Sequence, residues 1–250
     1  MFDTFFYNPI YNLIIFLSNY LVDFGTVIII STIIIKFLIY PLYSGQIKNQ
    51  IATKKAQPEL KEIQEKLKDK KLSQFQRQEL MMKMMAVNKK YGVKILTPLI
   101  SLIVQMMVIM ALYWIIYRSG FPKINTDLLY SFVHSTKEHL SMNFLGWFDL
   151  TKPSWILGLL AGITQFIHME ISMPDIHWSD LKKSGKDTKE DMMKSFQVYM
   201  KYGFPLMAVL LLTFTLNAAI GLYWVTSNIF MIFQERAIRG KKKELKEIED

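Results

Sequence analysis

The stretch from Phe24 to Tyr43 reads FGTVIIISTIIIKFLIYPLY and carries a single charged residue, Lys36. A bilayer core about 30 Å thick requires about 20 mainly apolar helical residues, so this stretch predicts a membrane span. The whole chain agrees, because 51% of its 250 residues are hydrophobic and its 30 basic and 21 acidic residues gather in a few segments. This composition disfavours a soluble globular protein and excludes disordered and coiled-coil classes.

Several kinds of chemistry are excluded by what the chain lacks. It contains no cysteine, which rules out a disulfide framework, a thiolate zinc site and a cysteine nucleophile. No HExxH, GxSxG or Walker sequence is present, and the histidines show no metal-ligand spacing; they are His134, His139, His168 and His177. We therefore expect no catalytic residues, no cofactor and no metal ion.

Five apolar windows follow one another along the chain, at 24–43, 95–117, 154–173, 198–215 and 216–233. The last two are short and nearly contiguous, which predicts a tight helical hairpin under slight hydrophobic mismatch. Lys201 lies near the start of the fourth window, from which we expect its side chain to reach the membrane interface. The fold class predicted is an all-α polytopic membrane protein with five transmembrane helices.

The distribution of basic residues predicts the orientation, because loops rich in Lys and Arg remain in the cytoplasm. Residues 1–22 hold no Lys or Arg, whereas 44–93 hold 12 of them against 5 Asp and Glu. We expect the N-terminus and the loop 118–153 outside. The segment 44–93, the loop 174–197 and the basic tail 234–250 are then cytoplasmic.

Residues 1–22 predict an amphipathic helix in the outer membrane interface. One face carries Phe6, Ile10, Leu13, Ile14, Leu17 and Leu21, and another carries Asn8, Asn12 and Asn19. The segment lacks the basic start and the small-residue cleavage site of a signal peptide. A sixth membrane span is the alternative interpretation.

Segment 44–93 predicts a charged antiparallel helical hairpin. Ser73 followed by Gln76 predicts a capping box at the start of a helix over 74–91, and Gly92 predicts its end. The second helix contains four methionines, Met81, Met82, Met84 and Met85. These fit either packing inside the hairpin or an adaptable surface for an apolar substrate or a targeting factor.

Polar side chains recur within the predicted spans. Lys36 lies about 10 Å below the cytoplasmic end of its span, where an ammonium costs on the order of 3 kcal/mol. Further polar residues recur at helical spacing on four spans: Thr32, Tyr40 and Tyr43 beside Lys36; Ser101 and Gln105; Gln165, His168 and Ser172; Asn217, Trp224 and Asn228. Converging stripes predict a hydrophilic groove. Snorkelling of Lys36 and ordinary hydrogen bonding between helices are the alternatives.

Three further features have simpler interpretations. The GxxxG pair Gly158 and Gly162 predicts close helix packing. His168 and Glu170 suggest a proton relay, but their position near the cytoplasmic end favours solvated side chains. The net charge of +9 follows largely from the basic cytoplasmic segments, although the tail, including Arg236 and Arg239, is suited to anionic lipid or ribosomal RNA.

Six short segments, taken in order, resemble the YidC/Oxa/Alb family of membrane protein insertases. They are KFLIYPL at 36–42, QPELKEIQEK at 57–66, QM at 105–106, LAGITQF at 160–166, SMP at 172–174 and GLYWVTSN at 221–228. The resemblance runs from about residue 28 to residue 238 and is to bacterial members without a large periplasmic domain. One departure is Lys36, since the family's usual groove cation is arginine, and a lysine can lose its proton when desolvated.

This resemblance implies a five-helix core around a groove that is open to the cytoplasm and to lipid and closed outside. It implies that Lys36 attracts polar substrate segments, that Gln105 and Trp224 line the groove, and that Gln165 is a polar wall residue. The implied location is the bacterial cytoplasmic membrane. The implied partners are nascent membrane proteins, the ribosome, the Sec translocon, signal recognition components and anionic lipids.

Two other function classes are compatible with parts of this pattern. A secondary transporter or proton-coupled channel would use Lys36 as its substrate or proton site, but the missing internal repeats and scarce membrane carboxylates argue against it. A structural assembly partner for other membrane proteins is the third class. Insertion of a small substrate by the purified protein distinguishes the three.

Overall fold

The computed structural model describes residues 1–67, 69, 72–94, 96–118, 123–173, 176–179 and 195–249, with the side chains of 98, 118 and 241–249 left aside. These residues form two compact units. The first comprises Met1–Leu38 and Met106–Asp250, and the second comprises Ile39–Gln105. Helix α5 (Thr97–Arg118) contributes residues to both units.

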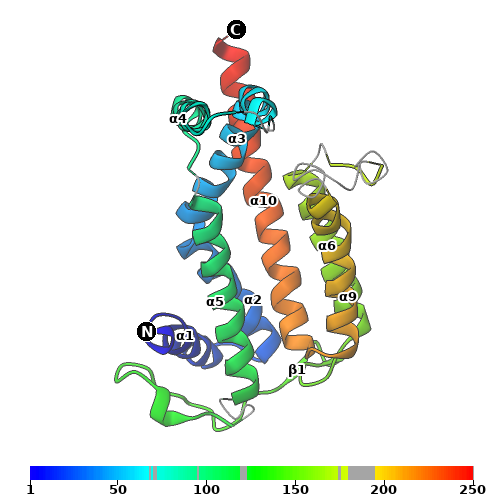
Figure 1. Ribbon diagram of the computed structural model, residues 1–250. Coiled ribbons are helices and arrows are strands. Elements are labelled where there is room, and N and C mark those ends of the chain that lie inside the picture. The colour runs from blue at the N-terminus through cyan, green and yellow to red at the C-terminus, as the bar shows by residue number, and fades with distance from the viewer. Residues whose placement is uncertain are drawn as a thin grey trace. The chain divides into compact units, whose positions relative to one another are not determined.

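The first unit is mainly helical. Its elements are a π-helical turn η1 (Asp3–Tyr7), α1 (Asn8–Ser18), α2 (Phe24–Leu38), the second part of α5, the short turn η2 (Thr126–Leu128), β1 (Asn143–Phe144), β2 (Phe148–Asp149), α6 (Trp155–Ser172), η3 (Tyr199–Gly203), α9 (Phe204–Phe214) and α10 (Ala218–Glu249). The two strands pair antiparallel, with Phe144 opposite Phe148. Helix α10 packs against α2 and against α6, and it lies between α2 and the pair formed by α6 and α9 (Figure 1).

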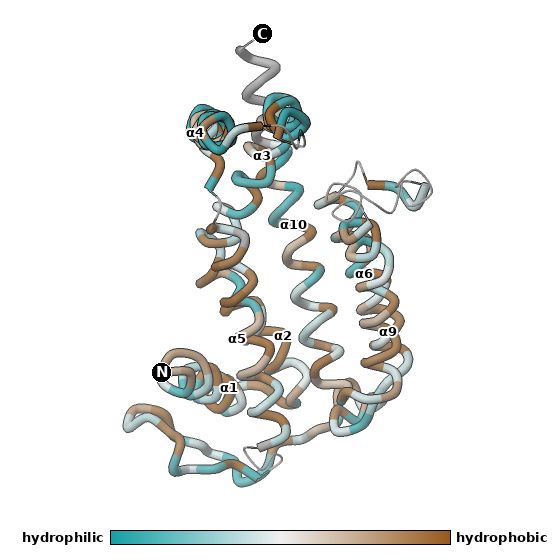
Figure 2. The backbone as a smooth tube through the Cα atoms, in the orientation of Figure 1, coloured by the Kyte–Doolittle hydropathy of each residue, from teal (hydrophilic) through white to brown (hydrophobic). Residues whose placement is uncertain are grey.

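Several helices in the described part of the chain are long enough to span a membrane. Leu99–Tyr117, Trp155–Ser172 and Ser195–Phe214 are each long and apolar enough to cross a bilayer. Helices α2 and α3 (Tyr40–Leu67), separated by Ile39, add a fourth span if they form one broken span. Along α10, apolar turns alternate with polar ones (Figure 2). The chain is thus an all-α membrane protein of several spans, while the number five stays a prediction.

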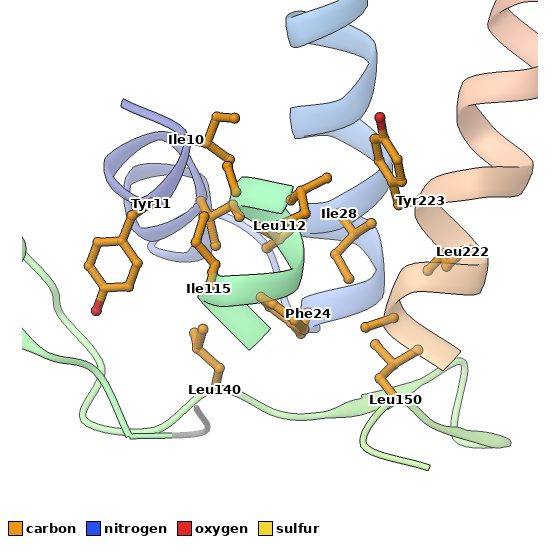
Figure 3. Packing of buried hydrophobic residues seen from close by; sticks show 14 of the residues in the cluster. Ile10, Tyr11, Phe24, Ile28, Leu112, Ile115, Leu140, Leu150, Leu222 and Tyr223 are labelled. Carbon is orange, nitrogen blue, oxygen red and sulfur yellow. The ribbon is translucent and has the colours of Figure 1, made fainter. Parts of the chain in front are cut away.

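The apolar core of the first unit lies where α1, α2, α5 and α10 meet the loop before α6 (Figure 3). Ile14 and Ile115 are fully buried there, and Phe24 is 1% exposed. Gly25 allows the loop to approach α2 closely, because a Cβ atom at this position would collide with the ring of Phe144. Burying a large apolar side chain contributes about 1.5–3 kcal/mol, so this cluster fixes the loop against the helices.

The polar face of α1 forms hydrogen bonds with the loop that precedes β1 in the same chain. The sequence did not predict these bonds. Asn12 donates to the carbonyl of Leu128 at 2.9 Å and accepts from the amide of Tyr130 at 2.7 Å. Asn19 donates to the carbonyl of His134 at 2.6 Å. These side chains satisfy backbone groups of the loop, because an irregular segment cannot pair its own amides.

The second unit contains the predicted hairpin of α3 and α4 (Gln74–Tyr91). The capping box is confirmed, since Ser73 and Gln76 exchange side-chain-to-backbone hydrogen bonds, and Gly92 ends the helix with a φ of 69°. Glu59 of α3 accepts hydrogen bonds from Lys90 and Tyr91 of α4, at 2.6 and 2.5 Å. These bonds hold the pKa of Glu59 below its usual range.

Candidate functional site

Small residues bring α6 against its neighbours, as the GxxxG pattern predicted. A Cβ atom at Gly162 would collide with the side chain of Val209, and one at Gly158 would lie 2.5 Å from Oγ1 of Thr213. Across the other contact, a Cβ atom at Gly221 of α10 would lie 3.2 Å from Leu157 of α6. Such close approach brings the polar side chains of α6 and α10 within reach of one another.

Two predicted site residues meet between α6 and α10. The indole nitrogen of Trp224 donates to Oε1 of Gln165 at 3.0 Å, and Gln165 is only 3% exposed. One turn further along α10, Nδ2 of Asn228 donates to Oγ1 of Thr164 at 3.2 Å. Within the described part of the chain, Oδ1 of Asn228 is buried without a hydrogen-bond partner. The two helices therefore share a buried polar seam, which we define as Gln165, Thr164, Trp224 and Asn228.

A charged cluster lies at the C-terminal end of α6. Glu235 of α10 is fully buried. It accepts from Ser172 at 2.5 Å and from Nη2 of Arg239 at 2.7 Å, and it lies 3.3 Å from Nε2 of His168. The expectation of a solvated His168 is wrong, because α10 covers this residue and leaves it 6% exposed. Arg239, expected to be available to lipid or RNA, binds Glu235 instead.

A second buried charge lies on the helix that follows. Lys201 is fully buried and donates to the backbone carbonyls of Met173 and Ile176, at 3.0 and 2.6 Å. Its ammonium also lies 3.0 Å from a carboxylate oxygen of Glu170, which is half exposed. Lys201 thus binds two carbonyls of the segment that follows α6, and its expected reach to the membrane interface stays a prediction.

Lys36 is buried in α2, with 3% of its surface exposed. One turn earlier, Thr32 is also buried, and its hydroxyl donates to the carbonyl of Ile28 at 2.6 Å. Helix α2 packs on α10, where Phe37 meets Phe230 edge to face with ring centroids 5.0 Å apart. The structure thus places a basic residue inside the first unit, on the helix that borders α10 opposite α6 (Figure 1).

Gln105, Ser101, Tyr40 and Tyr43, which the sequence also placed in polar stripes, belong to the second unit. Gln105 is partly buried near the middle of α5, one turn after the buried Ser101. Tyr40 and Tyr43 lie in α3, after the interruption at Ile39, so the polar stripe through Lys36 is not carried by one continuous helix. The structure therefore brings Gln165 and Trp224 together, places Lys36 in the same unit, and leaves Gln105 in the other.

The sequence analysis did not predict Glu235 as a site residue, and it did not predict that Lys201 is buried. A signal for Glu235 was present, because an acidic residue directly after an apolar window, four residues before Arg239, predicts an ion pair on one helix face. The described residues contain no group of three His, Asp or Glu side chains able to hold a metal ion. The site offers buried hydrogen-bonding groups and buried charges.

A family model and several curated proteins match most of this chain. The model of the family described as "60Kd inner membrane protein" matches residues 16–246. The membrane protein insertase YidC of Oceanobacillus iheyensis is 34% identical over 84% of this chain and 72% of its own length. YidC 2 of Bacillus anthracis is 31% identical over 95% of this chain and 81% of its own. The insertase MisCA of Bacillus subtilis is 28% identical, over 95% and 79%.

Proposed function

This chain belongs to the family of the 60Kd inner membrane protein, and we propose that it is a membrane protein insertase that integrates nascent membrane proteins and helps them fold. Its relatives carry the insertase name and match it over most of their lengths. The chain is a multi-pass membrane protein of the bacterial inner membrane. It is not an enzyme.

One observation carries the proposal: polar and charged side chains are buried among the helices of the first unit, and some of these helices are apolar enough to cross a membrane. Lys36 and Gln165 are each 3% exposed, and Asn228 is 1% exposed. Polar groups in hydrocarbon cost several kcal/mol unless they are paired, and ionisable residues inside membrane spans mark pathways and substrate sites. A polar segment of a nascent chain that meets these groups loses less solvation than one that enters lipid directly.

The proposed working element is a hydrophilic groove among five spans, open to the cytoplasm and to lipid and closed outside. Lys36 attracts acidic substrate segments, Gln105 and Trp224 line the groove, and Gln165 forms part of its wall by orienting the indole of Trp224. The apolar segment of the substrate slides into lipid beside the groove. Its partitioning, at about 25 cal/mol per Å² of apolar surface, drives the step without a nucleotide.

The proposed orientation places the N-terminus outside and the basic tail in the cytoplasm. The partners proposed are nascent membrane proteins, the ribosome, the Sec translocon and signal recognition components, together with anionic lipids. Binding to anionic lipids is supported by the exposed Arg236 and by the lysines at 241–243 of the sequence, because basic clusters are attracted to anionic lipid.

Reconstitution tests this function. Purified protein in liposomes is expected to integrate a substrate with one or two spans, detected as a protease-protected fragment, without added nucleotide or ion gradient. Transport of a solute without substrate integration would favour a transporter. Neither activity would favour a scaffold, and both outcomes would overturn the proposal.

Solvent accessibility tests the groove separately. Because the native chain has no cysteine, single cysteines at Lys36 and Gln105 report only on their own sites. We expect both to react with a membrane-impermeant thiol reagent applied from the cytoplasmic side. A cysteine at Leu102, which is 58% exposed on the apolar surface of α5, is the lipid control. Reaction at Lys36 and Gln105 no faster than at Leu102 would contradict a water-filled groove.

A further inference from the structure

The turn between β1 and β2 holds a residue in an unfavourable backbone conformation. Leu145 and Gly146 have φ angles of 55° and 71°, and Leu145 is the one non-glycine residue with positive φ in the described chain. The amide of Trp147 closes the turn by donating to the carbonyl of Phe144 at 3.2 Å. Turns with two left-handed residues favour Asn or Gly, because a larger side chain collides with its own backbone.

Contacts inside the protein do not compensate for this strain. Leu145 is 67% exposed and Trp147 is 89% exposed. An asparagine at position 145 would fit the turn better and would also suit water. Strained residues persist where a function or an outside contact maintains them, so the exposed apolar tip itself needs a partner.

The tip has a defined place at the ends of the apolar helices. The amide of Phe24, the first residue of α2, donates to the carbonyl of Ser141 at 3.0 Å, and Phe144 packs on Gly25. After β2 the chain enters α6 at Trp155, which is 65% exposed. The hairpin therefore lies at the level where α2 and α6 begin.

The charge pattern around the tip fits a lipid interface. Residues 140–148, LSMNFLGWF, contain no charged side chain. The next residue, Asp149, lies 2.9 Å from the ammonium of Lys152 and also accepts from Thr151, and these hydrogen bonds lower the pKa of Asp149 to about 2. The hairpin thus has an uncharged apolar tip, and the charge next to it, on Asp149, is paired with Lys152. An interfacial anchor has this arrangement.

We propose that Leu145 and Trp147 are a membrane anchor that inserts into the boundary between headgroups and acyl chains, in the leaflet at the end of the bilayer where α2 and α6 begin. Tryptophan is enriched at this boundary, because its ring is apolar and its N–H can bond water or headgroups. The anchor pins the loop before α6 to the lipid surface and thereby fixes the entry of α6. A protein docked on the tip is the competing occupant.

Spin labels measure the position of the tip. The variant Trp147→Cys, labelled with a nitroxide and reconstituted in liposomes of phosphatidylethanolamine and phosphatidylglycerol, is compared with two controls. Glu138→Cys reports an exposed polar site on the same loop, and Leu159→Cys reports an exposed apolar site on α6. The measured quantity is the ratio of nitroxide collisions with oxygen, which concentrates in lipid, to collisions with a water-soluble nickel chelate.

We expect this ratio at position 147 to exceed that at Glu138 by about threefold or more and to approach that at Leu159. A ratio equal to that at Glu138 would place the tip in water and overturn the anchor. Low collision rates with both reagents would reveal a protein covering the tip and would overturn it equally.

A second label keeps the native tip intact. A nitroxide at Asn143, which is exposed on β1, is measured with Leu145 and Trp147 unchanged, and again in Leu145→Asn and in Trp147→Ala. The asparagine relieves the turn, so the fold is retained. We expect both substitutions to lower the collision ratio at position 143. An unchanged ratio in both would show that these side chains do not hold the hairpin at the membrane.

Discussion

Replacing Glu235 with alanine is expected to destabilise the helical core of the first unit. Glu235 is fully buried, and its two oxygens are occupied by Ser172, Arg239 and His168. Alanine removes every one of these contacts. It leaves the guanidinium of Arg239 and the ring of His168 against a cavity, in a place where water cannot readily replace the carboxylate.

The size of the effect follows from the burial of the partners. Removing one member of a buried ion pair costs about 3–5 kcal/mol. The side chain of Arg239 keeps 27% of its surface exposed and recovers some solvation, so we expect a loss near the lower limit, about 3 kcal/mol. For a chain of this length about 2–4 °C is lost per kcal/mol, which gives a fall in Tm of about 6–12 °C.

Thermal unfolding in detergent micelles, followed by circular dichroism, measures this fall. The matched control is Glu79→Ala, which removes an exposed pair with Lys83 on α4 and should leave Tm unchanged. Glu235→Gln keeps the shape of the side chain and an acceptor for Ser172. Its Tm should therefore lie between the Tm values of Glu235→Ala and Glu79→Ala. A Tm for Glu235→Ala within about 2 °C of the Glu79→Ala value would refute the reasoning that this cluster locks α6 to α10.

Three further predictions use other contacts. Gly162→Ala should lower the free energy of unfolding by about 1–3 kcal/mol through overpacking, and adding Val209→Ala should restore part of it; additive losses in chemical denaturation would contradict close packing. Trp224→Phe leaves Oε1 of Gln165 without its donor and should cost about 1–3 kcal/mol; a double mutant with Gln165→Leu should cost less than the sum of the single changes. Because its hydrogen bonds lower the pKa of Glu59, the α3–α4 contact is strongest above the usual pKa of 4.5 and weakens as the pH falls below that value. Spin-label distances between the two helices should therefore broaden on acidification in the native chain, and a Glu59→Gln variant should lack this pH dependence.

Local features could be predicted from the sequence. The capping box at Ser73 and the stop at Gly92 depend on residues within one helical turn, so spacing alone identifies them. The packing role of Gly162 follows from its missing side chain. The interruption at Ile39 also had a local signal, because Pro41 lacks an amide proton and cannot continue the hydrogen bonds of α2.

Partnerships across the fold could not be predicted. His168 and Glu235 lie 67 positions apart, and the periodicity of each helix shows which face is polar without showing which face of another helix it meets. The burial of Lys201 depends on carbonyls at the end of α6 that the sequence does not mark. Asn12 likewise fits a water-facing surface until the loop that it binds has been placed.

The role of Lys36 is tested most directly by insertion assays with paired substrates. Two single-span substrates that differ only in whether the translocated segment carries acidic or neutral residues are inserted by native protein, Lys36→Ala and Lys36→Arg in liposomes. We expect Lys36→Ala to reduce insertion of the acidic substrate much more than that of the neutral one, and Lys36→Arg to retain both. Equal reduction of both substrates by Lys36→Ala, or none, would contradict an electrostatic role for the buried ammonium.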